Sequence, residues 1–299
     1  MLFSLTPRPL YSICATFGQG IVSLFSFSAC TYLLGELCAQ GSNDLNGTGI
    51  MEFVNLLIIF VVAAIAGSFG TLVGGSSLIT IPTLIFLGLP PHTAIGTDRI
   101  GVTGIASAGW YEFHRKEMVN YRIGFIISVP TVLGSILGAN LVFQFNETIL
   151  KKAIAIITIV ILVFMVGFRP KMGVQKADHT LKSHEYLIGV VISFFVGIYA
   201  GFYGAGAGTL ISYILLLVFK QTFLECAGTL KMPGLFFTAI AAIIFAIHRA
   251  IDYPMAFAMF VGGFTGSYLA AHYSDRIGNI WIRRLFLTAV LVMAIKLLL

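Results

Sequence analysis

Charged residues are scarce in this chain of 299 residues. Asp, Glu, Lys and Arg make up 10% of it, while 58% is hydrophobic and the mean hydropathy is +0.96. A soluble domain has about 25% charged residues, so this chain has too few to cover a surface that faces water. Apolar stretches recur at the length of about 20 residues that crosses a bilayer core of about 30 Å. We predict an all-α integral membrane protein that is multi-pass and lies in the cell membrane, the inner membrane of a bacterium.

Other features that are missing exclude several classes of protein. The four cysteines show no C-x-x-C spacing, which argues against a disulfide framework and against a metal site. The net charge of +6 is spread over loops instead of forming a basic arm, so we expect no nucleic-acid partner. No close His/Glu/Asp cluster and no serine nucleophile elbow is present. We therefore expect no cofactor, and an intramembrane enzyme is the weakest of the candidate functions.

Residues 1–52 differ from the rest of the chain. An apolar run over residues 10–39 is broken by polar residues and is followed by a polar linker. We interpret 1–52 as an N-terminal extension, because Met51 looks like the natural start of a first span; an uncleaved signal-like segment or an additional span stays open. From residue 53 we predict ten apolar segments: 53–72, 75–89, 94–113, 122–143, 149–168, 186–203, 206–219, 225–247, 254–272 and 280–298.

Two copies of one unit are predicted on either side of the longest polar stretch. Residues 53–168 form the first membrane repeat, 169–185 a cytoplasmic linker, and 186–299 the second membrane repeat. Matching residues keep an almost constant separation, which chance pairing of glycines does not explain. They are Gly70 with Gly201 and Gly75 with Gly206 at a shift of 131, and Gly96-Thr97 with Gly228-Thr229, Tyr121 with Tyr253 and Gly134-Ser135 with Gly266-Ser267 at a shift of 132. An odd number of crossings per copy makes the two repeats inverted and pseudo-symmetric.

Each predicted repeat contains a glycine-rich break before a short segment. The breaks cover residues 67–77 and 201–209, and the segments 75–89 and 206–219 are short for a span, so they either cross or are re-entrant. A helix that restarts after such a break offers unpaired N–H groups and the positive end of its dipole, which suits an anion. The alternative is close helix packing through small residues. The candidate binding residues of the two breaks are Gly75, Ser76, Ser77, Gly206 and Gly208.

A cation follows the break in each copy. Arg99 in Thr97-Asp98-Arg99 corresponds to Lys231 in Thr229-Leu230-Lys231, and each begins an apolar segment. A cation within membrane depth costs roughly 2.5 kcal/mol or more, so it normally faces a polar cavity or a partner. We expect Arg99 and Lys231 to bind one anion; snorkelling to the headgroups, or an ion pair with Asp98, stays open. Thr97 and Thr229 either bind the ligand or cap their helices.

These motifs together resemble the TauE/SafE family of sulfite and sulfonate exporters. The resemblance covers about 53–298 and rests on Gly75-Ser76-Ser77, Gly96-Thr97-Asp98-Arg99, Asn120-Tyr121-Arg122 and Gly134-x3-Gly138-Ala139, with Gly204-Ala-Gly-Ala-Gly208, Gly228-Thr229-Leu230-Lys231, Asp252-Tyr253 and Gly266-x3-Ala270-Ala271 in the second copy. It implies four-helix repeats with seven or eight spans. It also implies export or uptake of sulfur-containing or small organic anions. The chain departs from the family pattern at Gly-Ser-Ser and Gly-Ala-Gly in place of a triple glycine, at Tyr213 opposite Pro82, and at Asn120-Tyr121 in place of Asp-Trp.

We therefore predict a secondary transporter that moves a small anion across the lipid bilayer by alternating access. The anion is expected to be sulfur-containing, such as sulfite, a sulfonate or thiosulfate, or else a small organic acid. A passive anion channel of the same architecture is the second interpretation. A proton is a candidate coupling ion, with His114 and His248 as candidate carriers. A homo-oligomer stays open.

The loop charges predict the orientation in the membrane. If every segment crosses, eleven loop cations fall on one face and Lys151, Lys152 and Arg249 alone on the other, and the positive-inside rule makes the first face cytoplasmic. Cysteines placed in 114–122 and 169–185 should then react with an impermeant thiol reagent only after the cells are opened. Labelling of both loops from outside intact cells would overturn this orientation.

Overall fold

The structure is a computed structural model that describes residues 48–72, 74–167 and 183–274. The predicted extension up to residue 47, most of the predicted linker and the predicted segment 280–298 lie outside the described residues. The chain divides into two compact units, Met1–Val54 and Asn55–Leu299. The helix breaks and the cavity between them belong to the second unit.

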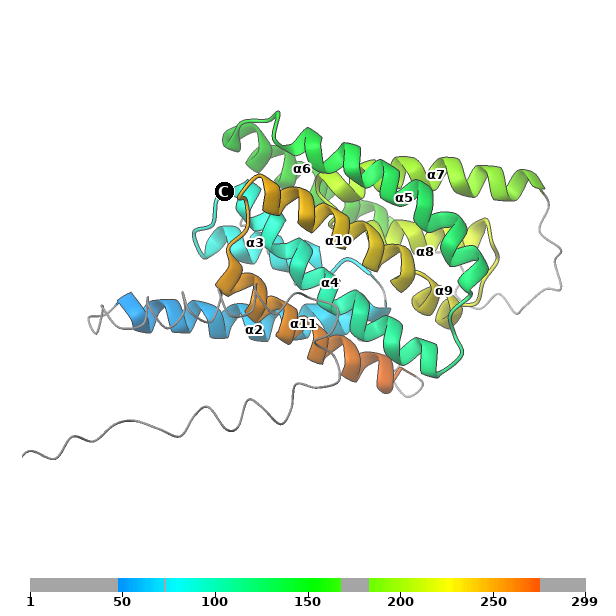
Figure 1. The fold of residues 1–299 in the computed structure, drawn as a ribbon, viewed down its shortest axis with the longest axis horizontal. Coiled ribbons are helices and arrows are strands. Elements are labelled where there is room, and N and C mark those ends of the chain that lie inside the picture. The colour runs from blue at the N-terminus through cyan, green and yellow to red at the C-terminus, as the bar shows by residue number, and fades with distance from the viewer. Residues whose placement is uncertain (1–47, 73, 168–182, 275–299) are drawn as a thin grey trace, which may run out of the picture. The chain divides into compact units, whose positions relative to one another are not determined.

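The described residues form helices joined by short loops and contain no strand, which confirms the all-α fold (Figure 1). The helices are α2 (Thr48–Leu72), α3 (Ser77–Phe86), α4 (Pro91–Arg115), α5 (Tyr121–Val142), α6 (Glu147–Gly167), α7 (Ser183–Phe202), α8 (Ala207–Leu217), α9 (Phe223–Thr229), α10 (Lys231–Ile247) and α11 (Tyr253–His272). Within the described residues, five stretches are long and apolar enough to cross a membrane: Met51–Leu72, Tyr121–Val142, Ser183–Phe202, Leu224–Ile247 and Tyr253–His272. A multi-pass membrane protein follows from this pattern.

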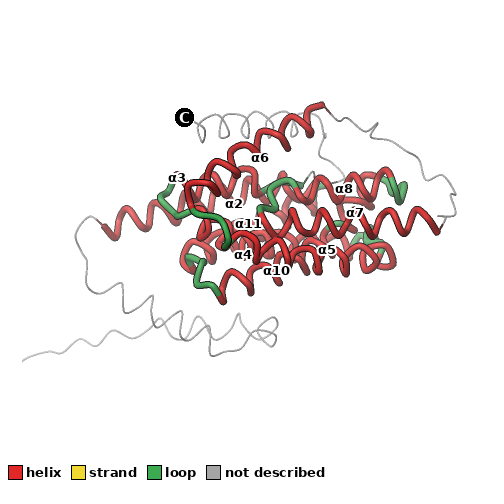
Figure 2. Tube along the Cα trace, turned by 90° about the horizontal axis from the view of Figure 1, so that it is seen from above, coloured by secondary structure: helices red, strands yellow, loops and turns green. Residues whose placement is uncertain are grey.

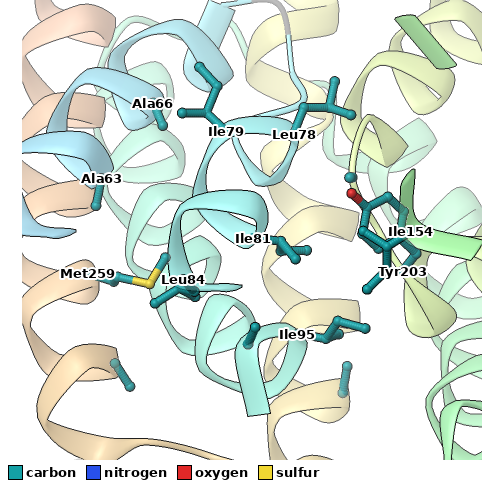
Figure 3. Close-up of a cluster of buried hydrophobic side chains, with 14 of the residues drawn as sticks. Ala63, Ala66, Leu78, Ile79, Ile81, Leu84, Ile95, Ile154, Tyr203 and Met259 are labelled. Carbon is teal, nitrogen blue, oxygen red and sulfur yellow. The ribbon is translucent and has the colours of Figure 1, made fainter. Parts of the chain in front are cut away.

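Helices α3 and α8 are too short to cross. They have 10 and 11 residues, and at 1.5 Å per residue each is about 15 Å long, roughly half of a bilayer core. Most of their residues are buried, including every residue of α3 from Ser77 to Leu84. Figure 3 shows α3 surrounded by other helices, with α2 beside it running in the opposite direction. These two apolar segments are therefore half-length helices enclosed by the bundle.

The short helices leave the predicted orientation unchanged. A helix that enters the membrane and a half-length helix that turns back together return the chain to the face where it started. Two complete crossings would return it to that same face. The loops after α3 and α8 therefore stay on the faces to which the loop charges assign them. What changes is the place of the two glycine-rich breaks, which lie inside the bundle; Figure 2, with loops in green, shows such a break midway along the helices beside α8.

Glycines set the distance between the long helices. A methyl group built on Gly138 of α5 would lie 2.8 Å from the backbone nitrogen of Phe202 in α7, and one on Gly67 of α2 would lie 2.7 Å from the carbonyl oxygen of Gly263 in α11. Such close approach is typical of helix pairs in membranes. Helices α5 and α2 belong to the first predicted repeat and α7 and α11 to the second, so each of these pairs joins the two predicted repeats; the repeats and their inverted relation stay predictions.

Gly138→Ala should destabilise the protein, because its methyl group would meet backbone atoms that cannot turn away, and overpacking of this kind costs about 1–3 kcal/mol. Gly234→Ala in α10 is the matched control. Its methyl group would meet only the Cβ of Ala106 at 3.9 Å, and alanine favours a helix over glycine by about 1 kcal/mol. Thermal unfolding in detergent should show a lower midpoint for the first variant and an equal or higher one for the second. Equal midpoints for both would contradict this close packing of α5 on α7.

Candidate functional site

The two glycine-rich breaks contact each other inside the bundle. Gly74 and Gly75 have φ angles of 82° and 86°, and Gly204 and Gly206 have 72° and 79°. These are left-handed conformations that glycine adopts without strain and that other residues avoid. A methyl group built on Gly208 would lie 3.2 Å from the Cα of Gly74. The breaks of the two predicted repeats therefore meet backbone to backbone.

A small cavity lies at this junction. Its volume is about 50 Å³, which is room for a few water molecules or a small ligand. Six of the predicted binding residues line it: Gly75, Ser76, Ser77, Arg99, Gly208 and Lys231. Apolar side chains of α4, α8 and α10 form the rest of the wall, among them Val102, Ile105, Ile211 and Phe237. One wall is thus polar and cationic, and the other is apolar.

Two helices begin at this cavity without a side-chain cap. The residues that precede α3 and α8 are Ser76 and Gly206, and neither gives its helix a capping hydrogen bond from a side chain. The first N–H groups of a helix have no partner within it, and they carry the positive end of the helix dipole. The sequence predicted this arrangement from the paired glycines.

Arg99 lies fully inside the protein, with 1% of its surface exposed. Its Nη2 donates a hydrogen bond to the carbonyl oxygen of Tyr203, which directly follows α7. Its Nε is buried and has no hydrogen-bond partner among the described residues. The guanidinium therefore binds a carbonyl group at the broken end of α7, and its Nε is left without a partner among the described residues. Such burial excludes snorkelling to the headgroups.

Lys231 has the corresponding position in the second predicted repeat. It is 2% exposed, and its Nζ donates to the carbonyl oxygen of Gly70, near the end of α2, over a long 3.4 Å. Each cation thus reaches the broken helix of the other repeat. Across the described ranges, neither cation forms an ion pair with a carboxylate. A buried charge in this state is costly unless another group compensates it.

Asp98 has no exposed surface, and two hydroxyl groups of α3 bind its carboxylate. Ser77 Oγ donates to Oδ2 over 2.7 Å, and Thr80 Oγ1 donates to Oδ1. Sequence reasoning considered an ion pair between Asp98 and a cation and missed these two partners. The spacing of Ser77 and Thr80, three residues apart on one helical face, is the signal that could have indicated them. In the second repeat the corresponding residue is Leu230, which carries no charge.

The other three predicted residues do not line the cavity. Gly206 provides the backbone turn before α8. Thr97 Oγ1 accepts a hydrogen bond from the backbone N–H of Asp252 over 2.9 Å, and Thr229 Oγ1 accepts one from the N–H of Asn120 over 3.0 Å. Since Asn120 and Asp252 are the N-caps of α5 and α11, the two threonines join the repeats reciprocally. A role for them in binding the ligand stays a prediction.

Long apolar helices, two helix breaks and a cavity between them with a cationic wall and an apolar wall define a multi-pass membrane protein with a ligand-sized internal site. Residues 59–297 match the family described as Sulfite exporter TauE/SafE, and the chain belongs to that family. It is therefore a membrane transporter and not an enzyme. No solved structure matches it.

Curated relatives cover most of the chain. A "Probable membrane transporter protein" of Haemophilus influenzae is 30% identical over 72% of this chain and 84% of its own length. "Probable membrane transporter protein ORF9" of a Sinorhizobium species is 26% identical over 83% and 94%. "Probable membrane transporter protein YfcA" of Escherichia coli is 24% identical over 81% and 88%. Their names agree with a transporter and specify no substrate.

Thr97→Val and Thr229→Val test the two hydrogen bonds that join the repeats. Each change keeps the shape of the side chain and leaves a backbone N–H without its acceptor, which costs about 1–3 kcal/mol. We expect lower unfolding temperatures in detergent for both variants, and unchanged ligand affinity because neither residue lines the cavity. Thr148→Val, at an exposed position of α6, is the control and should change neither quantity. Weaker ligand binding with unchanged stability would instead place the two threonines in the binding site.

Proposed function

We propose that this transporter moves a small anion by alternating access, and that the anion binds in the cavity between the two helix breaks. One observation carries the proposal. Two buried cations, Arg99 and Lys231, converge from the two predicted repeats on a single cavity and have no carboxylate partner among the described residues.

Electrostatics favours an anion at this place over a neutral or cationic ligand. The two side-chain cations and the N-termini of α3 and α8 all present positive potential to the cavity. In a medium of low dielectric constant such interactions are much stronger than in water. A bound anion would complete the hydrogen bonding of Arg99 Nε and of the Lys231 ammonium group.

The size and the lining of the cavity support a small substrate. A volume of about 50 Å³ accommodates an oxyanion such as sulfite or thiosulfate, or a sulfonate or carboxylate with a short apolar part beside Val102 and Phe237. The family name points to sulfite, and the proposed substrate class follows from membership of that family. Most residues that line the cavity are buried, and Val102 and Gly208 are half-buried, which supports a carrier better than a continuous channel.

Substrate screening in sealed proteoliposomes tests this function. Sulfite, thiosulfate, sulfoacetate and short carboxylates are each loaded inside, and uptake of the labelled anion from outside is followed. A carrier should show saturable counterflow, in which internal anion accelerates uptake of external anion. Flux that rises linearly with concentration and shows no counterflow would favour a channel, and no flux of any anion would reject anion transport.

Arg99→Gln and Lys231→Gln should each raise the apparent substrate constant about ten-fold or more, because a charge-assisted hydrogen bond is worth roughly 1.5–3 kcal/mol. Lys231→Arg should have a milder effect, since the positive charge is retained. Lys151→Gln is the control, because Lys151 is exposed at the start of α6. Wild-type kinetics in a well-folded double variant of Arg99 and Lys231 would reject the proposed site.

A further inference from the structure

We infer that Asp98 is the binding site of a coupling proton, which enters and leaves the transporter together with the anion. The inference rests on the proposed anion site and adds to it a second, chemically different site. The first predicted repeat has a carboxylate, Asp98, beside the cavity. The second repeat lacks it, because Leu230 occupies the corresponding position.

The carboxylate of Asp98 is separated from the cavity by one hydroxyl group. Ser77 lines the cavity, and its Oγ donates to Asp98 Oδ2 over 2.7 Å. Asp98 also directly precedes Arg99 in α4, so the acid and one of the cations of the anion site share a helical turn. A charge on Asp98 therefore acts on the anion site at short range and through a medium of low dielectric constant.

The charges at the site predict that proton and anion binding favour each other. With Asp98 ionised, its negative charge repels an anion and offsets part of the attraction from Arg99 and Lys231. When a proton from water binds the carboxylate, a carboxylic acid forms and the repulsion ends. By thermodynamic reciprocity, a bound anion must favour protonation by the same factor. The pair then moves as one proton and one anion, and both leave on the other side of the membrane.

The hydrogen bonds around Asp98 allow both protonation states. Ser77 and Thr80 donate to the ionised carboxylate. Thr80 Oγ1 also lies 3.3 Å from the carbonyl oxygen of Ser76, a second acceptor at the start of α3. When Asp98 takes up a proton, Thr80 can donate to Ser76 and leave a carboxyl oxygen free. The change requires the rotation of one hydroxyl group and no movement of a helix.

A proton fits this place better than a metal cation. The Asp98 carboxylate and the two hydroxyl groups bonded to it supply four oxygen atoms, fewer than the six to eight oxygen ligands of a calcium site. The start of α3 is also the positive end of its dipole, which disfavours a second positive charge. Proton relays through buried carboxylates are an established use of such residues within membranes.

Other charged and titratable groups near Asp98 define what else could respond to pH. Helix α3 itself contains none. Groups on the elements around Asp98 include Arg99 of α4, Lys231 of α10, Tyr199 of α7 and Tyr203 directly after it, Asp252 before α11, Glu225 and Cys226 of α9, and the exposed Glu147, Lys151 and Lys152 of α6. Helix α4 also contains His92, Tyr111, Glu112, His114 and Arg115, and α11 contains Tyr253, Tyr268 and His272. Asp98 alone among these is an acid that bonds to a residue of the cavity wall.

The test measures protons taken up per anion bound by the purified protein in nanodiscs. Calorimetric titrations with thiosulfate, methanesulfonate and acetate are run in pairs of buffers with different ionisation enthalpies, at several pH values between about 6.5 and 9, where all three anions stay ionised. Sulfite is left out because it takes up a proton itself near neutral pH. We expect the wild type to take up about one proton per anion at some pH in this range, and Asp98→Asn to bind the anion with no proton uptake.

Glu112→Gln is the matched control. Glu112 is the other buried carboxylate of α4, but it binds His272 Nδ1 over 2.8 Å and does not line the cavity. Its variant should keep the proton uptake of the wild type. In the wild type, infrared difference spectra should show a protonated carboxyl band that appears on anion binding; this observation decides the question if Asp98→Asn does not fold.

The possible outcomes separate the two proposals. Anion binding without proton uptake at any pH, uptake that persists in Asp98→Asn, or no protonated carboxyl band would overturn the coupling role of Asp98 and leave the anion site intact. Wild-type protein that binds none of the three anions would reject the proposed anion site itself, and the coupling role with it.

Discussion

A helix that ends inside a membrane protein leaves backbone groups without partners, and most of this site follows from how they are satisfied. Helices α2 and α7 both end within the bundle, at Leu72 and Phe202. An unpaired carbonyl or N–H group costs several kcal/mol in a medium without water, by order of magnitude. Arg99 donates to the carbonyl group of Tyr203 at the end of α7. Lys231 donates to that of Gly70 near the end of α2, which also accepts a hydrogen bond from the N–H of Gly74. Where α3 and α8 begin, the N–H groups of Leu78 and Ala207 already donate to the carbonyl oxygens of Gly75 and Gly204. In our proposal, a ligand completes the N–H groups that remain.

Because each cation contacts the opposite repeat, the same side chains contribute to the fold and to the proposed binding. Arg99 already holds the end of α7, and only its remaining donors are available to an anion. An anion that attracts the guanidinium or the ammonium group therefore competes with a contact between the repeats. A ligand can shift a conformational equilibrium only through such differential interactions. In our proposal this competition is what links anion binding to the relative movement of the two repeats.

The sequence predicted the helical class, the membrane setting, the glycine breaks and the two cations, because each has a strong chemical signature in a chain with so few charges. The sequence did not predict contacts between distant segments of the chain. That Arg99 would meet Tyr203, or Thr97 the N-cap residue Asp252, depends on how the repeats pack, which no local pattern specifies. The predicted apolar segment 225–247 is divided at Leu230 into α9 and α10. A hydropathy profile does not reveal the break between α9 and α10, because both helices are apolar.

The reactivity of a cysteine in the cavity wall decides whether an anion binds between the two breaks and is reached from each side of the membrane in turn. Ala106 lines the cavity, whereas the neighbouring Ala108 is buried outside it. In a protein without native cysteines, each position is replaced by cysteine, and its reaction with an impermeant thiol reagent is followed from either face of oriented vesicles. We expect the cysteine at 106 to react from both faces and thiosulfate to slow this reaction, whereas the anion should not change the reaction of the cysteine at 108. A cysteine at 106 that no anion protects would contradict the account.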